Sequence, residues 1–131
     1  MKDRAHFRKE SDFRKPTDEE RLLLERLLDA EFPGRDELAP MLRNLLVRTI
    51  DEDGGLELLT EVSGKAPVIK RVPVEAEAKD NDGIVIHIQL HVVDGKPVEL
   101  EFYREDAAIV RRMALPSAVE LIVLPPMPGE D

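Results

Sequence analysis

Residues 84–93, which read IVIHIQLHVV, place an aliphatic residue at every even position. Successive side chains of a β-strand point to opposite faces, so one face of this segment is entirely aliphatic and the other carries His87, Gln89 and His91. The frequent isoleucine and valine residues also favour a strand over a helix. The segment is therefore predicted to be a central strand with one dry face and one polar face.

The two histidines of this strand share the polar face, but they cannot share a metal ion. Four residues of strand span ~13 Å, whereas two nitrogens bound to one metal each lie ~2 Å from it. The chain also contains no cysteine that could supply a thiolate ligand. We therefore expect neither a metal site nor a cofactor.

The segment 97–104 follows an Asp-Gly turn and is predicted to pair with 84–93 in an antiparallel hairpin. A plain two-residue turn would place Leu90 opposite Glu99 and would mix the two faces. A shift of one residue, through a three-residue loop or a bulge at 94–96, restores an apolar face. This register opposes Val92 to Val98, Leu90 to Leu100 and Ile88 to Phe102. On the polar face it opposes His91 to Glu99, Gln89 to Glu101 and His87 to Tyr103.

Residues 68–78 are predicted to form the strand on the other side of 84–93, with Pro73 at an edge or a bulge. A turn at 79–83 then aligns Val72, Val74 and Ala76 with Leu90, Ile88 and Ile86. In this register Glu75 faces His87, Arg71 faces His91, and Glu77 lies on the same side. The candidate partner-binding face consists of Arg71, Glu75, His87, Gln89, His91, Glu99, Glu101 and Tyr103.

Three interpretations of this face are open. The first is a solvated face whose cross-strand pairs each contribute a few tenths of a kcal/mol to sheet stability. The second is a contact surface for a partner protein or a second copy of the chain, because Tyr, His and Arg side chains are suitable anchors. The third is a catalytic or metal site.

Two helices are predicted before the strands. Thr17 and Glu20 have the spacing of a capping box, so a first helix begins here and runs to about Glu31. Its leucines recur at spacings of three and four and form one apolar stripe: Leu23, Leu24, Leu27 and Leu28. A second, shorter helix is expected with Asp36 near its cap and Pro40 in its first turn. Its inward residues are Leu38, Met41, Leu42 and Leu45.

Further strands are expected at 46–50, 56–62 and 118–124. Helices followed by strands with short connections are typical of an α+β domain, because parallel strands would need helical crossovers. The predicted fold has two N-terminal helices packed on one face of a mainly antiparallel sheet of five to six strands. The single domain is expected to span 16–125, between a flexible tail at 1–15 and a C-terminal tail at 126–131.

The charge of the chain limits its partners. The net charge is -9, although residues 1–15 carry six Lys/Arg against three Asp/Glu. Nucleic-acid binding requires a basic face, so we expect no nucleic-acid partner. A basic protein partner or a homodimer fits better, unless the acidity only keeps the protein soluble.

No run approaches the ~18 apolar residues of a membrane span, and the first residues lack an apolar signal region. We therefore expect a cytoplasmic protein that does not bind membranes.

No catalytic constellation is recognisable in the sequence. Ser11, Ser63 and Ser117 lie outside any nucleophile motif, and the many carboxylates define no specific pair. The DNDG sequence at 80–83 resembles part of a calcium loop, but Ala78 and Gln89 would occupy two essential ligand positions. A hairpin turn is expected there, and no enzymatic activity is expected of the chain.

Three motifs in order carry a resemblance: PTDEE at 16–20, DGG at 53–55, and the block from DNDG at 80–83 to VELEFYRED at 98–106. Together they resemble a family of small uncharacterised bacterial proteins catalogued as a domain of unknown function. The resemblance covers roughly residues 14–116 and implies a signature strand with Glu99, Leu100, Tyr103, Arg104 and Asp106. The chain departs from the family pattern after Gly55 and after Asp106. Such small acidic domains are similar in style to immunity proteins that neutralise toxins.

The expected function is that of a non-enzymatic protein-interaction domain, an immunity-like or regulatory binder that uses an acidic surface. The alternative is a small-molecule-binding or enzymatic domain with a pocket between helices and sheet. A core closed by leucine and valine would favour the first, and a cavity with buried acids would favour the second.

Overall fold

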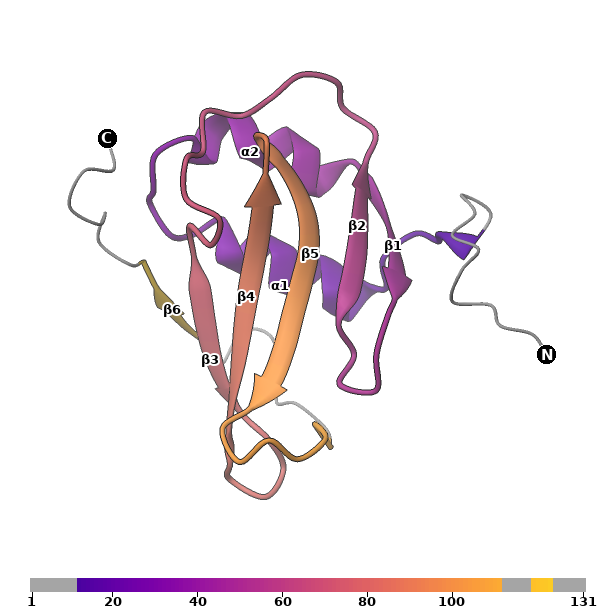
Figure 1. Cartoon of the computed structure of the whole chain (residues 1–131), viewed down its shortest axis with the longest axis vertical. Coiled ribbons are helices and arrows are strands. Elements are labelled where there is room, and N and C mark those ends of the chain that lie inside the picture. Colours follow the sequence, from indigo (N-terminus) through magenta and orange to yellow (C-terminus); the bar gives the residue numbers. More distant parts are fainter. Residues whose placement is uncertain (1–11, 112–118, 124–131) are drawn as a thin grey trace.

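The computed structural model describes residues 12–111 and 119–123, which form two layers (Figure 1). The helices are α1 (Asp18–Leu27) and α2 (Arg35–Arg43). The strands are β1 (Leu45–Thr49), β2 (Leu56–Thr60), β3 (Glu75–Lys79), β4 (Val85–Val93), β5 (Lys96–Arg104) and β6 (Glu120–Ile122).

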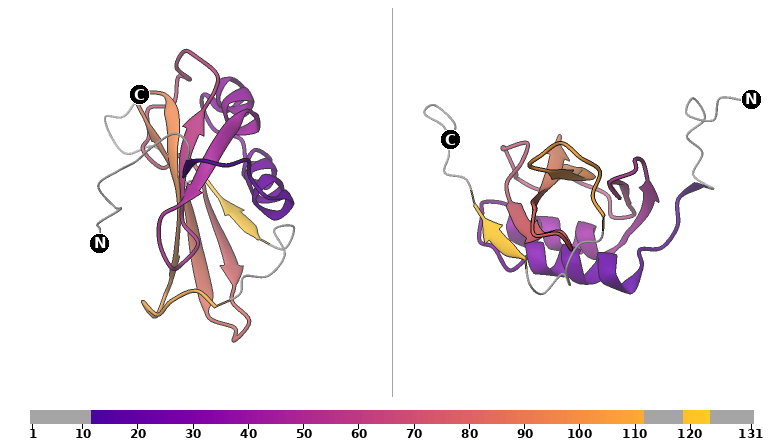
Figure 2. Two further views of the ribbon diagram at one scale, coloured as in Figure 1. Left: turned by 90° about the vertical axis from the view of Figure 1, so that its right-hand side faces the viewer. Right: turned by 90° about the horizontal axis from the view of Figure 1, so that it is seen from below.

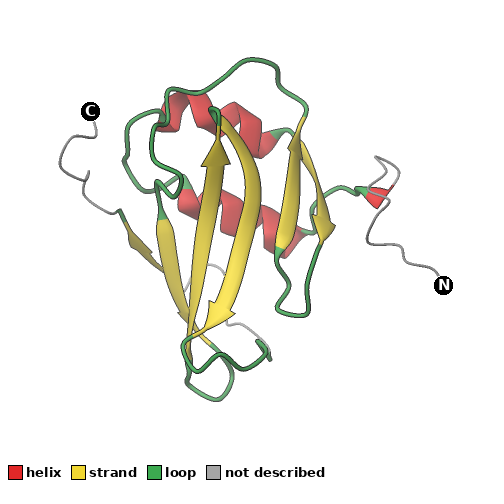
Figure 3. Ribbon diagram, in the orientation of Figure 1, coloured by secondary structure: helices red, strands yellow, loops and turns green. Residues whose placement is uncertain are grey.

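The six-stranded sheet has the order β1-β2-β5-β4-β3-β6, and all neighbouring strands are antiparallel. Both helices lie against one face of this sheet (Figure 2). The predicted α+β fold is confirmed (Figure 3).

Much of the predicted tail sequence lies outside the described residues. Of the predicted tail at 1–15, only residues 12–15 are described, and Arg14 forms two backbone hydrogen bonds of 2.8 Å with Val47 of β1. The predicted tail at 126–131 lies wholly outside. The strand expected at 118–124 is described only in part and contains β6, which pairs with β3. Within the described residues, neither helix is long and apolar enough to cross a membrane.

The start of α1 is the predicted capping box. Thr17 Oγ1 accepts a hydrogen bond from the Glu20 amide at 3.1 Å, and Glu20 Oε1 accepts one from the Thr17 amide at 2.9 Å. The helix ends at Leu27, earlier than the predicted Glu31. The reason is that the next three amides bond to carbonyls three residues back, which tightens the last turn and ends the α-helix.

The start of α2 differs from the prediction. Its N-cap is Gly34, whose φ of 88° is left-handed, and Asp36 lies in the first turn. Pro40 is not in the first turn but in the interior of the nine-residue helix, where it removes the bond to the Asp36 carbonyl. The Asn44 side chain donates to the Pro40 carbonyl at 2.8 Å near the end of the helix.

The β4–β5 hairpin has the predicted register over most of its length. Leu90 opposes Leu100 and Ile88 opposes Phe102, as predicted. The predicted Val92–Val98 pair is wrong, because Val92 opposes Pro97 across a bulge that follows His91. Asp94 and Gly95 both have positive φ, as a two-residue hairpin turn requires. The shift of register therefore arises inside the strand and not in the loop.

The β3 strand is shorter than predicted and pairs in a different register. Ala76 opposes Ile88, two residues away from the predicted Ile86. A shift of two residues leaves every side chain on its original face, so the division into dry and polar faces holds. The segment before Glu75 is not regular strand because Pro73 lacks an amide hydrogen for the ladder. It still follows β4, since the Arg71 carbonyl accepts from the Val92 amide at 2.7 Å.

The core between the layers is aliphatic. Leu23, Leu27 and Leu38 from the helices pack with Ile88 and Leu90 from the sheet, and all five are at most 2% exposed. Among the described residues, the buried charged side chains are Asp80 and Arg104, at one end of the sheet. The interlayer thus has the composition expected of a domain without a pocket between helices and sheet.

Candidate functional site

The sheet face opposite the helices is not covered by either described helix (Figure 2). We call it the open face. Its three rows across β4 and β5 pair His87 with Tyr103, Gln89 with Glu101 and His91 with Glu99, as predicted. All eight predicted site residues come together on this face, and Glu77 joins them. The open face is defined by Arg71, Glu75, Glu77, His87, Gln89, His91, Glu99, Glu101 and Tyr103.

Several open-face side chains are shielded by their neighbours. The exposed fraction is 14% for the His87 side chain and 13% for that of Glu75. It is 13% for the His91 side chain and 39% for that of Glu101. The imidazoles are therefore held within a layer of polar side chains.

His87 lies between carboxylates on both sides of its ring. Its Nδ1 is 3.0 Å from Glu75 Oε2 and 3.7 Å from Glu77 Oε2, and its Nε2 is 3.1 Å from Glu105 Oε1. Glu77, and not Glu75, opposes His87 in the ladder, so the predicted pairing is wrong. Glu75 reaches His87 diagonally from its place opposite Gln89, and it also accepts from Gln89 Nε2 at 3.0 Å.

The surroundings of His87 also fix its ring and its charge. The ring stacks on Tyr103, with centroids 5.0 Å apart and planes 20° apart. Partial burial lowers the pKa of His87, but the hydrogen bonds that its ring donates to Glu75 and Glu105 outweigh this effect and leave the pKa above its ordinary value of 6.5. Burial, together with Glu75, Glu101 and other nearby carboxylates, raises the pKa of Tyr103.

His91 has a different pair of neighbours. Arg71 Nε donates to His91 Nδ1 at 3.1 Å, and His91 Nε2 lies 2.8 Å from Glu101 Oε1. Because an arginine nitrogen can only donate, Nδ1 must offer its lone pair here. The hydrogen of the imidazole is then on Nε2 and points to Glu101.

Two groups on the open face have ligand-type atoms close enough to surround a cation. In each group the three atoms lie within 4.8 Å of one another. The groups are Glu75, Glu77 and His87, and His91, Glu99 and Glu101. The two histidines thus fall in separate groups, in line with the expectation that they cannot share an ion. Glu105 could not be predicted from the sequence, because it follows the end of β5 and strand alternation does not place its side chain.

A second charged cluster lies at the end of the sheet, on the helix side. Arg104 opposes Ile86, and its side chain is only 3% exposed. Its Nη1 lies 2.8 Å from Asp80 Oδ2 and 3.0 Å from Asp82 Oδ2, while Nε and Nη2 bind the two oxygens of Asp106 at 2.9 and 2.6 Å. The Arg104 guanidinium lowers the pKa of Asp106 to about 2. The ion pairs of this cluster link the β3–β4 turn to the end of β5.

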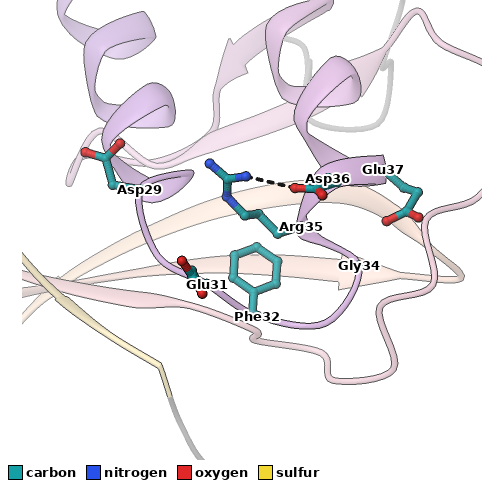
Figure 4. A pocket seen from close by; sticks show the side chains of 7 residues that line it. All are labelled: Asp29, Glu31, Phe32, Gly34, Arg35, Asp36 and Glu37. Atoms are coloured by element: carbon teal, nitrogen blue, oxygen red, sulfur yellow. Dashed lines mark hydrogen bonds and ion pairs between the residues drawn. The ribbon is translucent and has the colours of Figure 1, made fainter.

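A surface hollow lies at the connection between α1 and α2 (Figure 4). Arg35 crosses it and donates to the Leu28 carbonyl at 2.5 Å and to Asp36 at 2.8 Å. The hollow is lined by Asp29, Glu31, Phe32, Gly34, Arg35, Asp36 and Glu37. It lies at the helix connection and not at the position of the alternative pocket between helices and sheet.

Residues 13–114 match the family model of a domain of unknown function, DUF6984. The chain belongs to the DUF6984 family. The matched segment of this DUF6984 domain contains all elements from α1 to β5, the Arg104 cluster and every open-face residue. The predicted membership of an uncharacterised domain family is therefore confirmed. Comparisons with curated proteins and with solved structures gave no match.

Proposed function

We propose that this DUF6984 chain is a non-enzymatic protein-interaction domain, an immunity-like or regulatory binder whose open face contacts a basic partner. The observation that carries the proposal is a row of like charges. Glu99 of β5 directly opposes Glu57 of β2, and Glu101 adds a further carboxylate on the same face of β5. Like charges directly opposed in a sheet are destabilising, and Arg48 compensates the charge of Glu57. The carboxylates of Glu99 and Glu101 on β5 would attract a basic partner.

The composition of the rest of the face supports the same proposal. Two cations on this side, Arg48 and Arg71, already contact Glu57 and His91. Tyr103 is 37% exposed and stacks on His87, which makes it a pre-oriented aromatic anchor for a partner. Charge complementarity of this kind mainly raises the association rate and selects the partner.

The aliphatic interlayer favours this function over the alternative of a pocket between helices and sheet. Small-molecule sites are concave and need a few convergent polar groups. Leu27, Leu38, Ile88 and Leu90 fill the described interlayer, and the buried charges Asp80 and Arg104 neutralise each other at its end. No observation on the described residues favours an enzymatic site over a binding face.

Partner capture with charge-reversed bait tests the proposal. The wild-type chain and the double variant Glu99→Lys/Glu101→Lys are immobilised and exposed to native cell extract at low salt. The matched control, Glu31→Lys/Glu37→Lys, makes the same change of charge at the hollow beside the helices. Circular dichroism checks that all three are folded.

The expected result is a basic protein that binds wild type and control, elutes with salt, and is lost from the Glu99→Lys/Glu101→Lys variant. Rebinding of the purified partner then confirms direct contact. Equal capture by both double variants would overturn the proposal, as would loss of the partner from the control alone.

A further inference from the structure

The geometry points to a single divalent-cation site formed by Glu75, Glu77 and His87, selective for a Zn²⁺-like first-row transition metal. This inference goes beyond the proposed protein contact and does not depend on it, because the chain alone supplies all the ligands. The side chains come from neighbouring strands, β3 and β4. Neighbouring strands lie ~4.8 Å apart, so cross-strand ligands meet where two histidines along one strand cannot.

The spacing of the ligand atoms fits one ion. Two atoms bound at ~2.1 Å in tetrahedral geometry lie roughly 3.4 Å apart. His87 Nδ1 is 3.0 Å from Glu75 Oε2 and 3.7 Å from Glu77 Oε2, on either side of that value. Small rotations of the half-exposed Glu77 side chain, which is 37% exposed, suffice to close the site. Three protein ligands leave a fourth position for water or another donor.

The outer contacts of the ligands are those that a bound metal needs. A metal-binding histidine usually donates its other ring N–H to a carboxylate or carbonyl, which fixes its tautomer and orientation. His87 Nε2 faces Glu105 Oε1 at 3.1 Å, and the ring stacks on Tyr103. The second oxygen of Glu75 accepts from Gln89 at 3.0 Å. The ion would replace the hydrogen that Nδ1 now shares with Glu75.

The second group, His91 with Glu99 and Glu101, has similar ligands, but the imidazole tautomer of His91 is unsuitable for binding a metal. Arg71 donates to His91 Nδ1, so Nε2 carries the hydrogen and points at Glu101. A metal bound to Nε2 would require the ring hydrogen to be on Nδ1. That N–H would then face the N–H donor of Arg71. This group therefore serves as an internal control with the same residue types on the same face.

The ligand set also selects the class of cation. Imidazole nitrogen suits Zn²⁺, Co²⁺ and Ni²⁺, whereas Mg²⁺ and Ca²⁺ prefer oxygen ligands throughout. Two carboxylates balance the charge of one divalent ion. We therefore expect Zn²⁺ to bind with one-to-one stoichiometry, and Mg²⁺ and Ca²⁺ not to compete at equal concentration.

Isothermal titration calorimetry with Zn²⁺ alone, on chain freed of metal by a chelator, tests the site. Glu77→Gln and His87→Gln should each weaken binding by at least about 100-fold, more than the ~10–100-fold typical of outer contacts. Glu105→Gln should weaken it by about 10-fold. His91→Gln should leave it unchanged. Circular dichroism verifies folding, and Glu77→Gln keeps the test informative if His87→Gln fails to fold.

Absorption spectra with Co²⁺ give a second readout that does not depend on affinity. Intense visible bands of a four-coordinate ion should appear with wild type and with His91→Gln, and should be lost with Glu77→Gln. Zn²⁺ affinity unchanged in Glu77→Gln, or lost equally in His91→Gln, would overturn the inference. Either result would leave the test of the protein partner unaffected.

Discussion

On the open face, His87 is held by contacts to both of its ring nitrogens and to the face of its ring. Carboxylates approach both nitrogens of its ring, and Tyr103 packs against the ring plane. Arg104 occupies a comparable position at the end of the sheet, where three aspartates surround one guanidinium. In both places a charged group is held by several partners from different segments. Folding is linked to protonation there through His87 and Asp106, whose pKa values are shifted.

The pKa of His87 in the metal-free chain should lie above 6.5, because Glu75 and Glu105 favour the imidazolium. A raised pKa means that this contribution to stability is full below about pH 6.5 and is lost as the pH rises through the folded-state value. NMR titration of the imidazole signals measures it. Glu75→Gln should move the pKa of His87 downward, and an unchanged value would contradict the assigned contact.

Asp106→Asn should destabilise the domain in a manner that depends on pH. The pKa of Asp106 is lowered to about 2 by Arg104, so its contribution is present above the ordinary value of 3.8 and is lost as the pH falls toward 2. Urea unfolding at pH 7 should show a less stable variant, and the difference should shrink steeply as the pH falls from 4 through 2. The exposed turn variant Asp94→Asn serves as the control. A difference as large at pH 2 as at pH 7 would count against the ion pair.

Among the secondary-structure elements, the strands were predicted more accurately than the helices. The alternation of apolar and polar residues and the residues of the turns both indicated the sheet. The β4–β5 register followed from opposing Leu90 to Leu100, because one buried face permits few alternatives. The position of the bulge after His91 could not be predicted, because a three-residue loop or a bulge at 94–96 gives the same pairs in the rest of the hairpin. The two-residue shift of β3 could not be predicted because it preserves the faces that the pattern specifies. The interior position of Pro40 was missed because N-terminal proline is the commoner arrangement.

Gly34→Ala should destabilise the start of α2 more than Gly83→Ala destabilises the β3–β4 turn. Both glycines have φ of 88°, which costs alanine roughly 1–2 kcal/mol. A Cβ at Gly34 would also meet Val68 Cγ2 at 2.6 Å and the Pro67 carbonyl oxygen at 2.8 Å, whereas nothing lies within 4 Å at Gly83. Overpacking adds about 1–3 kcal/mol. Chemical unfolding of both variants measures the difference, and equal losses would refute the close approach of the loop at Val68.

At the scale of the whole molecule, one sheet face is closed by helices and the other is left with charged side chains. Sequence alone predicted eight of the nine open-face residues as a candidate binding face and placed Glu77 on the same side, because alternation assigns a face to each strand position. It could not supply the diagonal Glu75–His87 contact, the role of Glu105 or the buried Arg104 cluster, because these depend on register and on loops that fold back. Because one face of the sheet is covered by helices and the other is charged, the charged face limits how two copies of the chain can associate.

The chain should be a monomer in solution at moderate salt. Two copies that meet through their open faces would bring the carboxylates of Glu57, Glu99 and Glu101 from both copies into one interface, where they repel each other. Multi-angle light scattering measures the mass directly, and 14.8 kDa is expected. A stable dimer abolished by Glu99→Lys would instead support the homodimer considered from the sequence.

We propose that the open face is the surface that contacts a basic partner. A titration of the isotope-labelled chain with the captured partner, monitored by amide NMR signals, tests this directly. Shifts or broadening are expected at open-face positions of β3, β4 and β5, including His87, His91 and Glu99, while α1 and α2 remain unaffected. Changes confined to the helices or to the hollow around Arg35 would contradict it.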